Sequence, residues 1–366
     1  MKKVGLLTIH SPYNYGAALQ AYATQKSVCD IGAECKIIDF STSDTIRGKK
    51  FLRFGFSGKV IKHNIRNILC ASSFFERKKR FEQFKNRYMR LTYRSYTKDN
   101  IGNVRGEKFD CIITGSDQTL NLNLGTHSID REIFYLPFIN TKKISYAASM
   151  GEHIGDLTDV QQEFIKTALS EYSALSVREE VCADKIESLL GRRPEIIADP
   201  TLAIPREHWE TVVAPVEELP QKYILFYTVL SAPWTVEYVK MLSRETGLPV
   251  VAAHRQNSFE TNSGFLRFDT CGPAEFLYLI KNAALVVTTS FHGTAFSTIF
   301  SRPFVSLILG EGNRISSLLT HTGLENRGFR SAPDNLDLYN VDFTRAKEYL
   351  LETQSKNLDF LKRSIN

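Results

Sequence analysis

The strongest constraint on the fold is a repeated pattern in which short apolar runs end in polar or glycine residues and are followed by helical patterns. This alternation is typical of parallel α/β units, in which a helix joins each strand to the next. The first helix is predicted to begin near Gly16. The apolar runs of the first half predict strands at 4–9, 35–40, 111–114, 144–148, 174–177 and 196–198.

A second series follows a stretch with Pro205, Pro215 and Pro220, which we interpret as an interdomain connection. This series predicts strands at 223–229, 250–253, 285–289 and 304–308, and helices at 234–245, 273–282 and 293–300. The expected fold class is α/β, with two Rossmann-like, doubly wound domains that face a cleft lined by the carboxyl ends of the strands. The expected limits are 1–205 and 221–340, and we expect 341–366 to form a helix that packs back on the first domain.

Composition places the chain among globular proteins, since 43% of its residues are apolar and 23% are charged. No window approaches the roughly 18 uninterrupted apolar residues that a membrane-spanning helix needs, and the first residues turn polar too early for a signal peptide. The six cysteines form no CxxC pair and no Cys/His cluster, so we expect neither a disulfide framework nor a metal site. The expected location is cytoplasmic.

Positive charge is concentrated in one stretch, which we expect to be a basic helical insertion in the first domain. Residues 47–98 hold 16 Lys or Arg against Glu76 and Glu82, a local balance of +14 in a chain of net charge +6. The stretch is either a solvated helical surface or a surface that attracts a polyanion such as an anionic membrane. No nucleic-acid-binding motif accompanies it, so we expect no nucleic-acid partner.

The run ALVVTTSFHGTAF, residues 284–296, is the most informative segment. An apolar strand ends in polar residues there and a helix is predicted to follow, which places His292 at a strand-to-helix turn. Backbone N–H groups and the helix dipole favour an anion at such a turn, and a histidine adds a hydrogen bond, a charge or a proton. The alternative is a packed or capping histidine. Gly293 is expected to be exposed and to let a ligand approach the backbone.

Two strand ends in the first half carry polar residues suited to a substrate. The loop after the first strand contains Asn14 and Gly16, and it either closes on a substrate or is a capped turn. Neither GxGxxG nor the GK[ST] of a P-loop is present, so no dinucleotide or NTP is indicated. Ser116 and Asp117 offer a hydroxyl and a carboxylate that suit recognition or activation of an alcohol, although Asp117 can equally cap the next helix.

Arg178 follows a buried strand in LSVREE and offers a bidentate fork for a carboxylate or phosphate. The alternative is an ion pair or an arginine at a helix end. Asp199 closes another predicted strand and is expected to orient a neighbouring cation or to cap the turn.

Six motifs in this order resemble the bacterial polysaccharide pyruvyltransferase family: NYGAALQAYA, ITGSDQ, ISYAASMG, LSVREE, ADPTL and VTTSFHGTAFSTIFSRPFVSL. The resemblance covers the chain from near residue 4 to about residue 325. It implies a fold similar to the GT-B glycosyltransferases. It also implies an enzyme that moves the pyruvyl group of phosphoenolpyruvate onto two hydroxyls of a sugar in a surface or capsular polysaccharide, which forms a cyclic ketal. No cofactor and no metal are expected besides this donor substrate.

The resemblance also implies roles for individual residues. The donor-associated His and Arg of the family map onto His292 and Arg178, and we expect Asp117 to act on the acceptor hydroxyl. Many family members have Arg at the position of Ser290, and Arg314 is the candidate to replace that lost cation. The full set of expected substrate contacts is Asn14, Gly16, Ser116, Ser290, Phe291, Gly293 and Arg314.

If the acceptor sugar is carried on a polyprenyl diphosphate, the basic stretch could hold the enzyme at the inner membrane face. Two other functions stay open. One is a GT-B glycosyltransferase that uses a nucleotide sugar, for which Glu275 is a candidate ribose ligand, although a helix-capping role explains it equally. The other is a catalytically silent glycan- or phosphate-binding module, which the Ser at position 290 keeps open.

Overall fold

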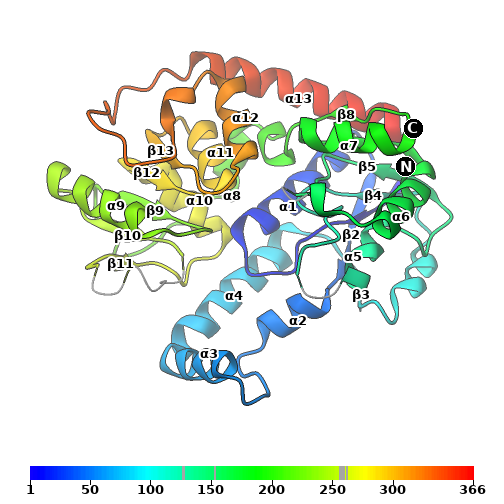
Figure 1. Ribbon diagram of the computed structural model, residues 1–366, viewed down its shortest axis with the longest axis horizontal. Coiled ribbons are helices and arrows are strands. Elements are labelled where there is room, and N and C mark those ends of the chain that lie inside the picture. The colour runs from blue at the N-terminus through cyan, green and yellow to red at the C-terminus, as the bar shows by residue number, and fades with distance from the viewer. Residues whose placement is uncertain (126–127, 152–153, 255–259, 261–262) are drawn as a thin grey trace. The chain divides into compact units, whose positions relative to one another are not determined.

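The computed structural model describes residues 1–366 except 126–127, 152–153, 255–259 and 261–262. The chain divides into two compact units (Figure 1). Unit 1 comprises 1–71, 82–204 and 353–366, and unit 2 comprises 72–81 and 205–352. Each unit is therefore built from segments that are not continuous in the sequence.

Unit 1 contains a six-stranded parallel sheet in the order β3-β2-β1-β4-β5-β6, the order typical of a Rossmann fold. Its strands are β1 (Lys3–Leu7), β2 (Glu34–Phe40), β3 (Leu91–Tyr96), β4 (Cys111–Thr114), β5 (Lys142–Ser145) and β6 (Tyr172–Ala174). A separate parallel pair is formed by β7 (Ser176–Val177) and β8 (Glu195–Ile196). The single strand predicted at 174–177 is thus wrong, because the chain leaves one sheet after Ala174 and joins another at Ser176.

The helices of unit 1 begin with α1 (Tyr15–Asp30), whose N-cap Asn14 accepts a hydrogen bond from the backbone N–H of Ala17 at 3.1 Å. The others are α2 (Ser43–Lys49), α3 (Gly58–Leu69), the ends of α4 (Ala71–Tyr88), α5 (Ser128–Glu132), α6 (Asp159–Ser170) and α7 (Glu180–Leu190). The basic stretch therefore contains helices followed by strand β3, which extends the sheet at its edge. Leu7, Ile38, Ile112, Val177 and Ile186 belong to the core of this unit.

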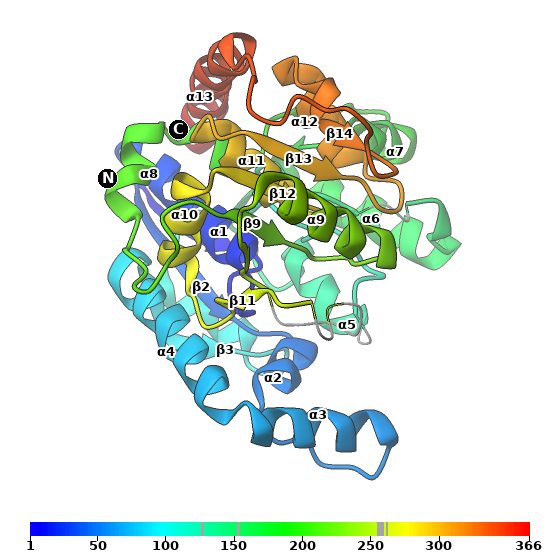
Figure 2. The same cartoon turned by 90° about the vertical axis from the view of Figure 1, so that its left-hand side faces the viewer.

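Unit 2 repeats the same strand order, β11-β10-β9-β12-β13-β14, and all its pairings are parallel. The strands are β9 (Ile224–Tyr227), β10 (Val250–Ala252), β11 (Leu266–Arg267), β12 (Leu285–Thr288), β13 (Phe304–Leu307) and β14 (Gly328–Phe329). The helices are the middle of α4, α8 (Arg206–Val212), α9 (Pro233–Thr246), α10 (Pro273–Asn282), α11 (Phe291–Ile299), α12 (Asn313–Thr322) and the first part of α13 (Thr344–Ile365). Figure 2 shows the strands of this unit from a second side.

The end of α13 packs on unit 1. Asn357 is buried and donates hydrogen bonds to the hydroxyl of Tyr146 at 2.8 Å and to the carbonyl of Ala198 at 3.0 Å. The ring of Phe360 stacks on that of Tyr146 at 6.1 Å between centroids. Among the helices of the described residues, none is long and apolar enough to cross a membrane.

Candidate functional site

Arg178 is held by three carboxylates at the carboxyl end of β7. Its side chain is only 3% exposed. Its Nε donates to Glu179 and its Nη1 to Asp199, both at 2.8 Å, and its Nη2 lies 3.7 Å from Oδ1 of Asp117. Burial opposes the charge, but these three carboxylates outweigh it and raise the pKa of Arg178 above its usual value. The formal charge of the four groups together is about −2, so Arg178 does not present an isolated cation to an anionic ligand.

Asp117 has a left-handed backbone with φ of 73°. This conformation costs most residues about 1 kcal/mol, and among residues other than glycine Asp and Asn tolerate it best. No helix follows directly, so the capping role considered for Asp117 is wrong; its Oδ1 instead accepts from the N–H of Gln118 at 2.9 Å. Its carbonyl accepts from the N–H of Ser149 at 3.0 Å, and its side chain is 20% exposed. The backbone is therefore fixed while the carboxylate stays accessible.

The other residues of unit 1 that the sequence predicts to contact a substrate have structural roles in the fold. Ser116 is fully buried and its hydroxyl donates to Oδ2 of Asp199 at 3.3 Å. Asp199 also accepts from the N–H and hydroxyl of Thr201 at 3.0 and 2.8 Å, so it both orients a cation and caps a turn, as the sequence predicts. Asn14 is exposed as the N-cap of α1, and Gly16 is buried in its first turn.

A His–Asp pair with a buried histidine and a partly buried aspartate lies at the ends of β1 and β2, and sequence reasoning missed it. His10 is 1% exposed, with Nδ1 3.1 Å from the carbonyl of Thr8 and Nε2 3.1 Å from Oδ1 of Asp39. Both neighbours offer acceptor oxygens, so either ring nitrogen has an acceptor within reach for a proton that it carries. Burial raises the pKa of Asp39, but hydrogen bonds from His10 and Ser95 outweigh it and lower the pKa to about 2.

Arg131 is a second buried arginine of unit 1 that the sequence did not single out. It is 7% exposed, and its Nε donates to the carbonyl of Leu124 at 2.9 Å. Burial lowers its pKa, and the nearby carboxylates of Asp117, Asp44 and Asp130 oppose that effect. Asp117 thus lies in the field of two guanidinium groups.

His292 lies at the strand-to-helix turn that the sequence predicts, in the first turn of α11 just after β12. Helix α11 begins at Phe291 rather than Gly293, and Ser290 is its N-cap, with a hydroxyl that accepts from the N–H of Gly293 at 3.4 Å. His292 is the second residue of the helix and is 8% exposed, with its ring edge-on to Phe291 at 5.2 Å. The imidazole of His292 therefore lies at the N-terminal end of α11, which is the positive end of its helix dipole.

The expectation that Gly293 is exposed and lets a ligand approach the backbone is wrong. This residue is buried, and a Cβ on it would lie 2.3 Å from Oγ1 of Thr288. That hydroxyl in turn donates to the carbonyl of Tyr227 at 2.7 Å and accepts from the N–H of Ser290 at 3.0 Å. Glycine is required so that α11 can pack closely on the end of β12, and not so that a ligand can approach.

The remaining predicted residues of unit 2 are Arg314 and Glu275. Arg314 lies in the first turn of α12 and is partly exposed. Glu275 is a capping residue, because its carboxylate accepts from the N–H of Gly272 at 3.1 Å at the start of α10. The capping interpretation of Glu275 accounts for its position.

A polar cluster of unit 2 lies after β10. It consists of His254, Glu260 and Arg267. Nδ1 of His254 accepts from the N–H of Thr228 at 3.3 Å, so Nε2 carries the proton and donates to Oε1 of Glu260 at 2.5 Å. Arg267 donates to the other carboxylate oxygen at 2.7 Å. Glu260 is fully buried; burial raises its pKa, but His254 and Arg267 outweigh this and lower it. No motif in the sequence marks this cluster.

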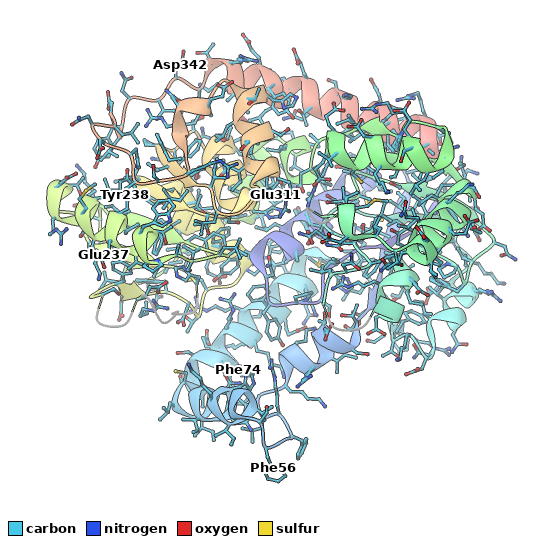
Figure 3. All side chains as sticks on the ribbon, in the orientation of Figure 1. Phe56, Phe74, Glu237, Tyr238, Glu311 and Asp342 are labelled. Atoms are coloured by element: carbon cyan, nitrogen blue, oxygen red, sulfur yellow. The ribbon has the colours of Figure 1, made fainter. Side chains whose placement is uncertain are left out.

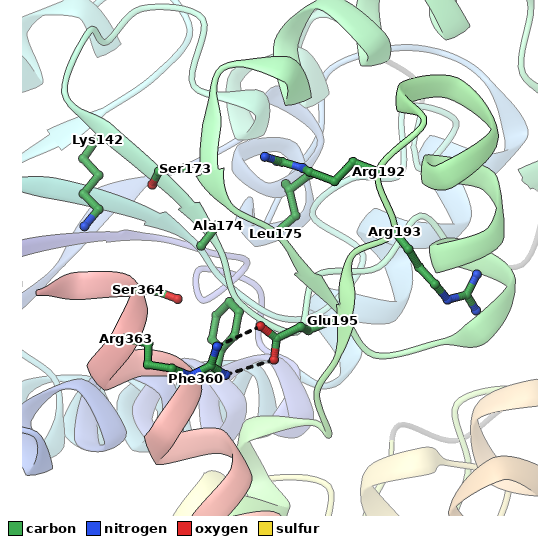
Figure 4. A pocket seen from close by; sticks show the side chains of 10 residues that line it. All are labelled: Lys142, Ser173, Ala174, Leu175, Arg192, Arg193, Glu195, Phe360, Arg363 and Ser364. Atoms are coloured by element: carbon green, nitrogen blue, oxygen red, sulfur yellow. Dashed lines mark hydrogen bonds and ion pairs between the residues drawn. The ribbon is translucent and has the colours of Figure 1, made fainter.

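A pocket of about 370 Å³ in unit 1 involves none of the predicted site residues (Figure 4). Lys142 at the start of β5 and Glu195 at the start of β8 line it, so it lies by the amino ends of these strands. Arg363 of α13 donates to both carboxylate oxygens of Glu195 at 3.2 and 3.1 Å, which helps to hold that helix on unit 1. Within the described ranges, no group of three or more His, Cys, Asp or Glu is placed to hold a metal ion.

Two parallel sheets of the same strand order, one in each unit, define a two-domain α/β protein with the GT-B fold. Similar solved structures include a putative UDP-N-acetylglucosamine 2-epimerase from Listeria monocytogenes, with a TM-score of 0.52 and 10% identity over 99% of this chain and 90% of that one. The UDP-GlcNAc 2-epimerase from Methanocaldococcus jannaschii has a TM-score of 0.51 and 12% identity, over 97% and 92% of the chains. Arabidopsis thaliana UGT89C1 complexed with UDP has a TM-score of 0.50 and 12% identity over all of both chains. At these identities the likeness shows the fold alone.

The chain belongs to the polysaccharide pyruvyl transferase family, which it matches over residues 14–309. The match spans segments of both units. No curated protein sequence matches the chain.

Proposed function

We propose that the protein transfers the pyruvyl group of phosphoenolpyruvate onto two hydroxyls of one sugar in a surface or capsular polysaccharide, with release of phosphate. The observation that carries this proposal is the family match over residues 14–309. In the reaction the methylene carbon of the donor gains a proton and the central carbon gains oxocarbenium character. One sugar hydroxyl adds there and loses its proton, phosphate leaves, and the second hydroxyl closes the ketal and loses its own proton.

His292 is proposed to act on the donor. Phosphoenolpyruvate carries a phosphate and a carboxylate, so its site needs N–H donors and positive charge. The first turn of α11 supplies the positive end of a helix dipole, and His292 adds a ring N–H or a proton at the same place. Ser290 occupies the position of the usual family arginine, and Arg314 in the first turn of α12 is the proposed replacement.

Asp117 is proposed to accept the proton of the sugar hydroxyl. Its partly exposed carboxylate on a fixed backbone supports this role. Because its guanidinium contacts three carboxylates, Arg178 is better assigned as a positioning residue for Asp117 and Asp199 than as a donor ligand by itself. This differs from the donor-binding role that the family resemblance implies for Arg178.

The test is phosphate release from phosphoenolpyruvate, measured against a panel of free and lipid-linked glycosides. We expect phosphate release that depends on one acceptor. His292→Ala and Asp117→Asn should each lower kcat by about 100-fold, since one lost transition-state contact costs about 2–4 kcal/mol. Asn keeps the left-handed backbone at 117 accessible, so this variant tests the carboxylate and not the turn. The matched controls are the exposed residues in His321→Ala and Asp99→Asn, which should keep wild-type turnover.

Two results would contradict the proposal. Release of a nucleotide from a nucleotide sugar, with no phosphate from phosphoenolpyruvate, would assign the chain to the glycosyltransferases that share its fold. Calorimetric binding of phosphoenolpyruvate with no acceptor-dependent turnover across the panel would make it a silent binding module.

A further inference from the structure

The segment 47–69, from the end of α2 through α3, carries positive charge without any compensating acid. It contains seven Lys or Arg and no Asp or Glu. Helix α3 and the loop before it belong to unit 1, and both views show α3 farther than α2 from the strands of that unit (Figures 1 and 2). A segment of this charge attracts anionic surfaces.

The same segment exposes large apolar side chains. Phe54 and Phe56 in the loop are 97% and 100% exposed, and Phe56 stands at the outer end of unit 1 (Figure 3). In α3, Ile61, Ile65 and Ile68 are each about half exposed. Their spacing of four and three residues places the isoleucines on one face of the helix, and Leu69 extends that face with 79% exposure. A solvated surface helix buries such a face, whereas α3 turns it outward.

The hydrogen bonds of α3 explain why the apolar face points outward. Asn64 accepts from the N–H of Arg53 at 2.8 Å and donates to its carbonyl at 2.9 Å. Asn67 donates to the carbonyl of Phe51 at 2.7 Å, and Nε2 of His63 lies 3.4 Å from the carbonyl of Lys50. The polar face of α3 therefore binds the loop 50–53. This contact fixes the rotation of the helix and leaves the isoleucines in solvent.

The combination of positive charge and exposed apolar side chains in the segment 47–69 fits an anionic lipid surface better than other partners. A second copy would bring seven like charges against seven, which opposes pairing through this face. A nucleic acid would neutralise the cations but would leave the isoleucines and Leu69 exposed, because aliphatic side chains offer bases no stacking surface. A bilayer interface satisfies both features, since acyl chains accept the apolar side chains and phosphate headgroups accept the cations.

We infer that the segment 47–69 is a monotopic membrane anchor that binds the surface of an anionic bilayer. Helix α3 lies in the plane of the interface, with Phe54, Phe56 and the isoleucine face in the acyl boundary. Exposed cations such as Lys50 and Lys62 lie at the level of the phosphates. The anchor does not depend on the proposed catalytic activity, and its test needs no turnover.

The experiment is flotation of the full-length protein with vesicles of phosphatidylcholine alone and of an equal mixture with phosphatidylglycerol. We expect binding to the mixed vesicles only, weakened by added salt. Lys50→Glu and Lys62→Glu should each weaken binding at least five-fold at low salt. Phe56→Ser and Ile65→Ser should each weaken it about ten-fold, because the apolar area no longer leaves water.

Matched controls come from exposed residues elsewhere in unit 1. Val160→Ser on α6, and Lys356→Glu and Lys362→Glu on α13, should leave vesicle binding unchanged. A fluorescent reporter gives a second measurement: Phe56→Trp should add a blue-shifted emission component only with the anionic vesicles, and Val160→Trp should not.

The inference is overturned by any of three results. Equal binding to both vesicle types would remove the role of charge. Unchanged binding of Phe56→Ser and Ile65→Ser would remove the role of the apolar face. A dimer in sedimentation equilibrium that these two substitutions dissociate, without vesicle binding, would assign the face to a second copy of the chain.

Discussion

Replacing Asp39 with Asn tests the partly buried pair that it forms with His10. Asn has nearly the same shape and its carbonyl oxygen can still accept from Nε2 of His10, so the substitution removes the negative charge with little change of packing. The pKa of Asp39 falls from an ordinary 3.8 to about 2 because His10 and Ser95 donate to the carboxylate. A shift of this kind means that the ionised form stabilises the folded protein.

The contribution of the Asp39 carboxylate to the free energy of unfolding follows from the size of its pKa shift. Each pKa unit is worth about 1.4 kcal/mol, so the carboxylate contributes about 2 kcal/mol at pH 7. Since the folded pKa lies below the unfolded one, this contribution is complete well above about pH 4 and is lost as the pH falls through about 2. About half of it should remain at pH 3.

The assay is urea denaturation of the wild type and of Asp39→Asn between pH 3 and pH 7. The difference in the free energy of unfolding should be about 2 kcal/mol at pH 7 and about 1 kcal/mol at pH 3. Asp99→Asn, at an exposed position, is the control and should show a difference near zero at both pH values. A difference for Asp39→Asn that does not change with pH would refute the reasoning, because it would come from packing and not from the charge.

Two further substitutions test the candidate sites by thermal denaturation. Arg178→Met should cost about 3–5 kcal/mol, because it leaves the buried carboxylate of Asp199 without its cation, whereas Arg193→Met, at an exposed position, should lower the melting temperature far less. Both arginines contact three carboxylates, so equal losses would contradict the assigned effect of burial. Gly293→Ala should cost about 1–3 kcal/mol, since its Cβ would meet Thr288, while Gly102→Ala, with open space around it, should be nearly neutral. A neutral Gly293→Ala would show that the contact with Thr288 relaxes.

Much of the fold could be predicted because each strand is a short apolar run with a clear end. The runs at 111–114 and 285–289 were found to within a residue, and the helix at 273–282 has the observed limits. Strand β3 was missed because its residues 91–96 contain no apolar run and no regular alternation, since Arg94 and Ser95 are consecutive polar residues inside a basic stretch. The break between β6 and β7 depends on which sheet each residue joins, and periodicity carries no such information.

The site could be predicted in most detail where one segment of the sequence holds all its parts. The turn from Ser290 to Gly293 is local, so the position of His292 followed from the pattern of the strand before it. His10 and Asp39 are 29 residues apart and meet only because β1 and β2 are parallel neighbours with Leu6 opposite Ile37. Sheet order is set by tertiary packing, so no local signal could have paired them.

The division of the chain has a consequence for any attempt to exchange its halves with those of a relative. Unit 2 takes 72–81 from within the first half, where Arg77 donates to the carbonyl of Asp269 at 2.8 Å, and unit 1 takes 353–366 from the far end. A gene cut once, between 204 and 205, would deprive each product of a segment that belongs to it. Chimaeras should therefore be designed with the middle of α4 and the end of α13 assigned to the units they complete, and recombination in nature faces the same restriction.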